Sequence, residues 1–246
     1  MAKERQILES EIIDVIKGKG EGYYSGYAYL DFREKYYDRI KDPADKAIVL
    51  DILMNFLKKG ESDSLFLGNV AWICADLEIP GTEDEIKRLS ADKRIKEAPN
   101  YLEFKVLLDQ FELEKHLIKE IQGMKFEINP AYSRDFLDRA VALFRKLRGD
   151  VSQIYVSKGT HDFKEPEFAR SMVSERLIRI LKSQKYEVSI KIRCALILSD
   201  FLVRSATHEI EKLLQNPQIT DASHINLIKQ TVAHLKEDYL TKKFGY

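Results

Sequence analysis

The sequence predicts an all-α protein that contains a tandem duplication of about 120 residues. Apolar residues recur at helical spacing through most of the 246 residues, and no segment has the sustained alternation of a strand. Glycine and proline residues such as Gly60, Pro80 and Gly123 divide these stretches into separate helices. A shift of 124 positions, which places Val49 on Val173, aligns the sequence with itself without a gap.

The self-match covers a central block of helices and contains about a dozen identities, which is typical of repeat architectures. The identical pairs are Val49 and Val173, Leu53 and Leu177, Leu57 and Leu181, Lys58 and Lys182, Ala71 and Ala195, Ile73 and Ile197, Asp76 and Asp200, Glu85 and Glu209, Ile86 and Ile210, Leu89 and Leu213, Ile95 and Ile219, and Lys105 and Lys229. We interpret the repeated residues as those that determine the fold of each copy. Function is therefore expected where the two copies differ.

The chain is expected to begin with an amphipathic helix. Ile12 and Ile16 belong to an apolar stripe at helical spacing, and Gly18 is typical of the end of a helix. A shift of 131 positions places the same stripe on Leu143 and Leu147, so the second copy is predicted to begin with a similar helix.

The rest of each copy is predicted to contain four helices. In the first copy they span residues 44–59, 65–77, 82–89 and 101–121, and in the second copy residues 167–182, 188–205, 207–214 and 221–239. The helix that starts at residue 82 is expected to be capped by Thr82, because acidic residues follow in its first turn.

The boundary between the copies is predicted near Asn129-Pro130, because the residue before a proline disfavours helical conformation. The two repeat units are residues 1–123 and 134–246, and the linker is residues 124–133. The sequence leaves open whether the units stack as one α-solenoid or form two similar helical bundles.

One stretch of the second copy has a more specific pattern. Residues 177–182 form an apolar helix end, a short polar turn follows, Val188 begins the next helix, and Ala195 lies within it. This pattern resembles that of HEAT-repeat proteins, which stack antiparallel helical pairs into an α-solenoid. The first copy departs from it, with Asn69 in place of Arg193, the residue type that often joins a polar ladder in such arrays. The resemblance implies an architecture that many unrelated functions share.

Composition argues against an electrostatically driven partner. The 40 basic and 40 acidic residues cancel, so no overall field attracts nucleic acid or an anionic membrane. No apolar run approaches the roughly 18 residues of a membrane span, and the N-terminus has no signal-peptide core. A cytoplasmic protein is therefore expected, in which Cys74 and Cys194 are buried, reduced thiols.

A search for metal-binding and catalytic patterns finds none in the sequence. No His-x-x-x-His pair or His and Cys cluster occurs among His116, His161, His208, His224 and His234. The sequence also lacks a nucleophile elbow, a phosphate-binding loop and a kinase signature. We expect no metal and no cofactor, and the sequence favours a non-catalytic protein over an enzyme without deciding between them.

Repeated carboxylates are the remaining candidates for catalysis. Asp31 and Glu34 recur as Asp162 and Glu165 and could form acid–base pairs, but the spacing is also that of a helix cap. A single active site does not require its residues in both halves, whereas a folding signal does. We interpret these carboxylates as structural, and Asp76 and Asp200 as residues that form hydrogen bonds between helices.

One segment of the first copy is unusually rich in tyrosine, and the second copy does not repeat this composition. Two hypotheses remain for it, a binding edge for a partner, or aromatic residues that plug the end of a helical stack. The candidate binding residues are Tyr23, Tyr24, Tyr27, Tyr29, Tyr36 and Tyr37.

Three functions are compatible with these patterns. The first is a non-catalytic scaffold that binds another protein through a helical face, and one version is a bacterial immunity or regulatory protein that inhibits a toxin or enzyme. The second is a HEAT-like DNA glycosylase, although such enzymes look strongly basic and use several tryptophans, and this chain has Trp72 alone. The third is a nucleic-acid-binding array that uses residues 93–96 and 145–148.

Overall fold

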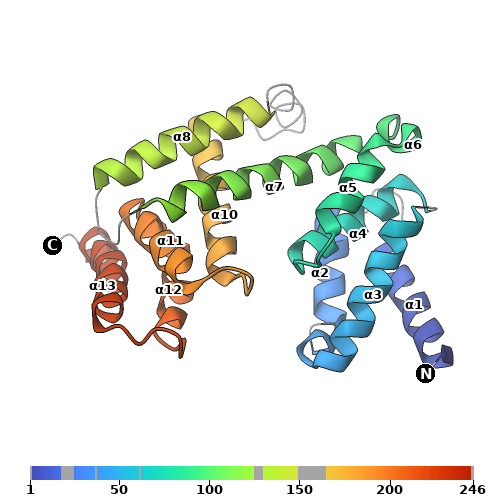
Figure 1. Cartoon of the computed structure of the whole chain (residues 1–246), viewed down its shortest axis with the longest axis horizontal. Helices are drawn as coiled ribbons and strands as arrows, with labels where there is room; N and C mark the ends of the chain where they lie inside the picture. The colour runs from blue at the N-terminus through green and yellow to red at the C-terminus, as the bar shows by residue number, and fades with distance from the viewer. Residues whose placement is uncertain are drawn as a thin grey trace. The chain divides into compact units, whose positions relative to one another are not determined.

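A computed structural model describes residues 2–17, 25–36, 38–60, 62–124, 130–148 and 165–244. These residues form helices and contain no strand, which confirms the all-α prediction (Figure 1). The chain divides into two compact units, Met1–Leu108 (unit 1) and Asp109–Tyr246 (unit 2). The repeat boundary expected at residues 124–133 remains a prediction.

Unit 1 is built around one central helix, α4. Its elements are α1 (Ala2–Lys17), α2 (Ser25–Tyr36), η1 (Arg39–Lys41), α3 (Pro43–Lys59), α4 (Ser64–Asp76), α5 (Thr82–Ala91), α6 (Lys93–Lys96) and the first part of α7 (Tyr101–Gln122). α4 contacts α1, α2, α3 and α5. All residues from Phe66 to Ala71 are buried, as expected for a helix with neighbours on several sides.

α3 has clear start and stop signals. Asp42 accepts hydrogen bonds from the backbone N–H groups of Ala44 (2.9 Å) and Asp45 (3.1 Å), and the next residue is a proline. Gly60 ends the helix in the left-handed conformation (φ 60°), and its N–H donates to the Phe56 carbonyl at 3.1 Å. The predicted helix at residues 44–59 is therefore confirmed.

α4 and the start of α7 approach each other closely at Gly68. A Cβ atom on Gly68 would lie 2.8 Å from Asn100 Nδ2 and 2.9 Å from Glu103 Oε2. Asn100 is held in place, because its amide donates to the Ser64 carbonyl at 2.7 Å. Glycine is therefore the residue that permits this approach.

α11 has the central place in unit 2. The elements of this unit are the second part of α7, α8 (Pro130–Arg148), α10 (Glu165–Lys182), α11 (Val188–Asp200), η2 (Arg204–Ala206), α12 (Thr207–Leu213) and α13 (Ala222–Phe244). α11 contacts α8, α10 and α13. Leu113, Leu117 and Ile121 of α7 belong to the same hydrophobic core.

The ends of α4 and α11 have the same backbone conformation, although they lie 124 positions apart; we call residues that differ by 124 in number counterparts. Both helices have 13 residues. Two positions beyond each helix is a non-glycine residue with positive φ, Glu78 (54°) and Leu202 (56°). These are the two such residues in the described part of the chain.

The same pair of backbone hydrogen bonds closes both turns. After α4, the Glu78 N–H donates to the Ala75 carbonyl (3.3 Å) and the Ile79 N–H to the Cys74 carbonyl (3.0 Å). After α11, the Leu202 N–H donates to the Ser199 carbonyl (2.9 Å) and the Val203 N–H to the Leu198 carbonyl (2.9 Å). This is the Schellman arrangement, in which the last carbonyl groups of a helix are satisfied by the turn that follows.

The predicted helix at residues 188–205 is wrong at its C-terminal end. α11 stops at Asp200, because the positive φ of Leu202 cannot continue a right-handed helix. Glycine is the usual signal for such an end, and neither Leu202 nor its counterpart Glu78 is a glycine. The other predicted helices are confirmed, although α13 continues beyond residue 239 to Phe244.

Two helix starts also differ from the sequence-based expectation. The N-cap of α5 is Gly81 (φ 83°), and the Thr82 hydroxyl donates to the Ile79 carbonyl at 2.7 Å, so the predicted Thr82 cap is wrong. α8 begins at Pro130, inside the residues expected as a linker. Proline at the first helical position favours a helix start, because its missing N–H would have no intrahelical partner there.

Candidate functional site: a hollow between α3 and α5

α3 carries more apolar surface than its neighbours cover. Val49, Leu53 and Leu57 are completely buried, whereas Leu50 is half-buried and Ile48 is 40% exposed. Apolar residues therefore extend beyond the stripe that faces the core. Part of this apolar surface lies next to α5, which also contacts α3.

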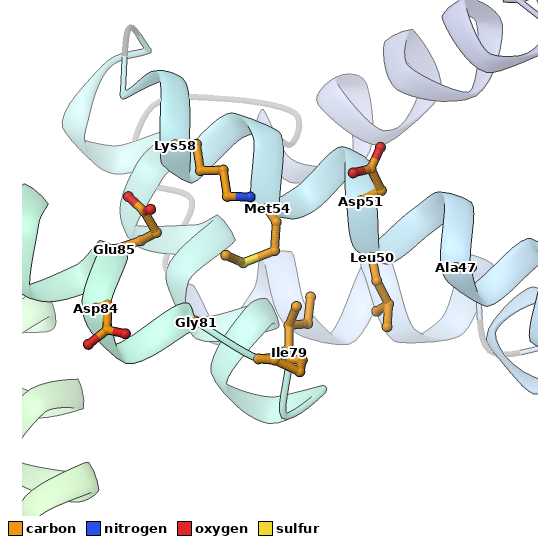
Figure 2. Close-up of a pocket in the computed structure, with 10 residues that line it drawn as sticks. Ala47, Leu50, Asp51, Met54, Lys58, Ile79, Gly81, Asp84 and Glu85 are labelled. Atoms are coloured by element: carbon orange, nitrogen blue, oxygen red, sulfur yellow. The ribbon is translucent and has the colours of Figure 1, made fainter.

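A hollow with a volume of about 480 Å³ lies on this side of α3, and we call it the α3–α5 hollow. Figure 2 shows the residues that line it. They are Ala47, Leu50, Asp51, Met54 and Lys58 of α3, Ile79, Pro80 and Gly81 of the turn after α4, and Asp84 and Glu85 of α5. The turn before α5 therefore contributes part of the wall.

The floor of the α3–α5 hollow is apolar. Met54 and Ile79 are each 7% exposed, and the side chains of Leu50 and Met54 project from α3 on the side where Ile79 lies (Figure 2). The Thr82 hydroxyl lies 3.7 Å from Met54 Sδ. Burial of apolar surface contributes about 25 cal/mol per Å², so this floor favours an apolar side chain from a ligand.

Two rim carboxylates are already paired with arginines. Arg5 forms an ion pair with Asp51, and Arg88 Nε donates to Glu85 Oε2 at 2.7 Å. Such exposed pairs add little to stability, but they neutralise charge at the rim of the hollow.

Lys58 and Asp84 remain available at the rim. Among the described residues, neither side chain has a hydrogen-bond or ion-pair partner. The Lys58 side chain extends toward Met54, whereas the Asp84 carboxylate points away from it (Figure 2). The charged group that extends toward Met54 is therefore an ammonium with no ion-pair partner among the described residues.

Arg88 also fixes α5 against α3. Its Nη2 atom donates to the carbonyl groups of Leu57 (2.6 Å) and Lys58 (3.0 Å) in the last turn of α3. A cation at a helix C-terminus satisfies carbonyl groups that have no intrahelical partner and interacts favourably with the helix dipole. Two walls of the hollow are thereby held together.

The counterparts of these residues in unit 2 differ in chemistry. Ser174 stands where unit 1 has Leu50, and His208 stands where it has Asp84. Lys182, the counterpart of Lys58, lies 3.9 Å from a carboxylate oxygen of Glu209. The second unit thus replaces an apolar floor residue with a polar one and engages the lysine internally.

Most of the tyrosines predicted to bind a partner cannot be placed in detail. Tyr23, Tyr24 and Tyr37 lie outside the described residues. Tyr27 and Tyr29 belong to α2, but their side chains are also outside what the structure describes. The hypothesis of a tyrosine-rich binding edge stays a prediction.

Tyr36, at the end of α2, is the exception. Its side chain is 1% exposed, and its ring packs against Phe32 with the centroids 4.9 Å apart. Burial, followed by the negative charge of Glu11, raises the pKa of Tyr36 to about 12. Tyr36 is therefore a core residue of unit 1 and does not present its ring to a partner.

Unit 2 contains a buried polar group that the sequence did not predict, formed by Gln110, Glu114, Arg176, Lys185 and Tyr186; we call it the Glu114 cluster. Glu114 Oε2 accepts from Arg176 Nη1 at 2.9 Å, and Oε1 accepts from Lys185 Nζ at 2.7 Å and from the Tyr186 hydroxyl. Arg176 Nη2 donates to Gln110 Oε1. The side chains of Glu114 and Arg176 are each 8% exposed.

The Glu114 cluster holds a charged pair inside the protein. Burial alone would raise the pKa of Glu114, but hydrogen bonds from Lys185 and Tyr186 and the charge of Arg176 outweigh it and lower the pKa. Both carboxylate oxygens have partners, as buried charges require. Because the cluster joins α7 to α10 and the turn after it, we interpret it as structural.

The spacing of residues could have revealed this cluster. Glu114 lies on the apolar stripe of α7, between Phe111 and Leu117, and Arg176 lies between Val173 and Leu177. A charged residue at a core position indicates a buried partner. The partner itself is invisible in the sequence, since the two residues are 62 positions apart.

The basic segment at residues 93–96 is largely neutralised. Arg94 pairs with Asp92 at 2.8 Å and donates to the Gly60 carbonyl at 3.0 Å, and Lys93 lies 3.7 Å from Glu97. Arg94 therefore ties α6 to the end of α3. The side chains of the second basic segment, residues 145–148, are only partly described.

The repeated carboxylates have mixed outcomes. Asp31 and Glu34 lie in the middle of α2, so their interpretation as a helix cap is wrong. Asp162 lies outside the described residues. The inter-helix role predicted for Asp200 is confirmed, because Ser133 of α8 donates to its carboxylate.

The two cysteines are buried free thiols, as the sequence predicted. Burial raises the pKa of Cys74 and of Cys194 well above the usual range, so neither is a thiolate at neutral pH. Across the described ranges, no three His, Cys, Asp or Glu residues are grouped closely enough to hold a metal ion. No helix in this part of the chain combines the length and the apolar character needed to cross a membrane.

The chain matches no protein-family model, no curated protein and no solved structure. Function is therefore inferred from the chemistry of the α3–α5 hollow. An apolar floor with a nearby ammonium can bind a ligand that combines an apolar group with an anion.

Proposed function

We propose that this protein is a non-catalytic helical-repeat protein that binds another protein through the surface formed by α3 and α5. The observation that carries the proposal is the α3–α5 hollow, which Leu50 and Met54 line together with Lys58, a residue that has no ion-pair partner among the described residues. Protein interfaces combine a desolvated apolar centre with polar groups at the rim, and this surface has both.

The architecture we propose is a tandem duplication of helical pairs, related to HEAT-like solenoids. Two observations support the duplication. α4 and α11 have bounds that differ by 124, as do the closing hydrogen bonds and the left-handed residues of their turns. In addition, Asp92 Oδ1 accepts from the Arg94 N–H at 2.8 Å, and the counterpart of each, Asn216 Oδ1 and the Gln218 N–H, forms the same bond at 3.0 Å.

Duplication supports a binding role for the surface that the copies do not share. Leu50 and Asp84 of the α3–α5 hollow have counterparts of other chemistry, Ser174 and His208. Lys58 is kept as Lys182, so what differs between the copies at this lysine is its surroundings. The two buried free thiols are compatible with the expected cytoplasmic location.

Quantitative affinity capture with a matched pair of variants tests the proposal. Ala47 lines the α3–α5 hollow and is exposed, and its counterpart Ser171 is exposed on α10. A glutamate at either position favours the helix, but at residue 47 it places a long charged side chain over the apolar floor.

We expect wild type and Ser171→Glu to capture the same protein from the native cells, and Ala47→Glu to recover at least about tenfold less of it. Equal recovery by all three forms, or the absence of a captured protein, would contradict the proposal. Circular dichroism on the purified variants checks that each remains folded.

A further inference from the structure

We infer that the α3–α5 hollow binds a segment of a partner protein in which an acidic residue lies close to a bulky apolar residue. The inference rests on the proposed function, since it specifies the chemistry of the partner segment at the same site. Its two parts come from two different features of the hollow, the apolar floor and the Lys58 ammonium.

The apolar part follows from the floor. Met54 and Ile79 are each 7% exposed and Leu50 is half-buried, so their side chains offer apolar surface at the bottom of a hollow of about 480 Å³. A cavity of this volume can hold the end of a large side chain but lies at the low end of the range for small-molecule sites. A leucine, methionine or phenylalanine of a partner fits this description.

The acidic part follows from the charges around the floor. The lining residues include three carboxylates and one lysine, which alone would favour a cation. However, Arg5 neutralises Asp51 and Arg88 neutralises Glu85. The remaining carboxylate, Asp84, points away from Met54, whereas Lys58 extends toward it (Figure 2). A carboxylate that enters beside the apolar side chain therefore meets an ammonium that has no partner among the described residues.

The second unit supports this assignment. Lys182, the counterpart of Lys58, lies 3.9 Å from Glu209, and Glu209 also pairs with Lys212 at 3.0 Å. In unit 1, Glu85 forms the equivalent pair with Arg88, and Lys58 has no ion-pair partner among the described residues. The lysine therefore lies near a carboxylate in unit 2, whereas no such contact is found for Lys58 in the part of unit 1 that the structure describes.

Selection of peptides on the purified full-length protein tests the inference. The probe is a displayed library of random 12-residue peptides, selected in parallel on wild type, on Lys58→Glu and on the control Lys182→Glu. Both lysines are exposed, so neither substitution is expected to prevent folding.

Wild type and Lys182→Glu should enrich peptides with an aspartate or glutamate within about four residues of a bulky apolar residue, the reach of one helical turn. Lys58→Glu should instead enrich peptides with lysine or arginine at that position. For the leading peptide, fluorescence polarisation should show a dissociation constant at least about tenfold higher with Lys58→Glu and unchanged with Lys182→Glu.

Several outcomes would overturn the inference. They are enrichment of basic peptides on wild type, equal affinities of wild type and Lys58→Glu, and failure to enrich any peptide. If a second copy of the chain occupies the hollow, sedimentation will show a dimer that Lys58→Glu dissociates, and this result also overturns it. If the occupant is an acidic small molecule, a free carboxylic acid that carries the same apolar group will bind as tightly as the leading peptide, and this result also overturns the inference.

Failure of the inference is distinguishable from failure of the proposed function. If the partner captured by wild type is lost with Ala47→Glu but retained with Lys58→Glu, the protein binds through the α3–α5 hollow without an acidic residue. If no protein is captured while the peptide preference still follows Lys58, the proposed function fails, whereas the acidic and apolar specificity of the hollow stands.

Discussion

Ile52 in unit 1 and its counterpart Arg176 in unit 2 are both buried, but their neighbours differ. Ile52 is part of an apolar core, whereas Arg176 is held by Glu114 and Gln110 of α7. The rims also differ, because Lys182 lies 3.9 Å from Glu209 in unit 2, whereas Lys58 has no ion-pair partner among the described residues of unit 1. The comparison teaches that unit 2 uses charge for its internal structure, while unit 1 leaves charge at its surface.

The strongest challenge to this comparison is removal of the central carboxylate in unit 2. Glu114→Ala leaves Arg176 buried without its partner, which should cost about 3–5 kcal/mol of unfolding free energy. Ile52 suggests the matched control, since the double variant Glu114→Leu/Arg176→Ile replaces the pair by apolar residues and should recover most of the loss. Urea unfolding of the three forms measures both effects, and a loss below about 1 kcal/mol for Glu114→Ala would indicate that the cluster is not formed.

Acid should weaken unit 2 through the same carboxylate. The pKa of Glu114 is lowered on folding, so its stabilising contribution is present above the unfolded value of about 4.3 and is lost as the pH falls through the folded value. Between neutral pH and about pH 3, the melting temperature of Glu114→Gln should therefore fall less steeply than that of wild type.

Asp200 provides a control of opposite sign. Burial raises the pKa of Asp200 and outweighs the hydrogen bond from Ser133 and the charge of His234, so the folded protein binds this proton more tightly than the unfolded chain. Its contribution is present at low pH and is lost as the pH rises through the folded pKa. In Asp200→Asn the melting temperature should therefore fall more steeply with decreasing pH than in wild type. A less steep fall in both Asp200→Asn and Glu114→Gln would contradict the assignment.

The close approach at Gly68 distinguishes unit 1, because its counterpart in α11 is Ile192. Gly68→Ala adds a Cβ atom within 3 Å of the Asn100 and Glu103 side chains. The resulting strain should exceed the gain in helix propensity, so that the variant is less stable than wild type by about 1 kcal/mol. Denaturant unfolding measures the change. Asn100→Ala in the same background should remove part of the penalty, and a stabilised Gly68→Ala single variant would show that α4 and α7 are less close than described.

The smallest expected change in unfolding free energy comes from the turn after α4, whose backbone conformation recurs after α11. Glu78→Gly relieves a left-handed conformation that costs a residue with a Cβ atom about 1 kcal/mol, so a gain of about 0.5–1 kcal/mol is expected. Glu78→Ala removes the same carboxylate but keeps the Cβ atom and should give no gain. Equal stability of the two variants would contradict the shared turn.

The helices were largely predictable because their signals are local. Asp42-Pro43 and Gly60 mark the ends of α3, and apolar periodicity marks its length. The end of α11 was not predictable, since Leu202 adopts a conformation that its residue type disfavours. That conformation is maintained by hydrogen bonds and packing around the turn, which no local pattern of residues indicates.

The candidate site was predictable only in part. An excess of apolar residues on α3, including Ile48, Leu50 and Met54, could have indicated an uncovered surface. Which charges remain available there could not be predicted, because it depends on the pairing of Arg5 with Asp51, 46 positions apart, and of Glu85 with Arg88. The tyrosine-rich segment attracted attention by composition, yet Tyr36 within it is a core residue.

The central claim is that unit 1 has a binding surface at the α3–α5 hollow that unit 2 lacks. Photocrosslinking in native cells tests it most directly, with p-benzoylphenylalanine in place of Ala47 in one form and of its exposed counterpart Ser171 in the other. The account predicts a crosslinked partner protein from position 47, with a yield at least about tenfold above that from position 171. Equal yields from the two positions, or a crosslink from position 171 alone, would contradict it.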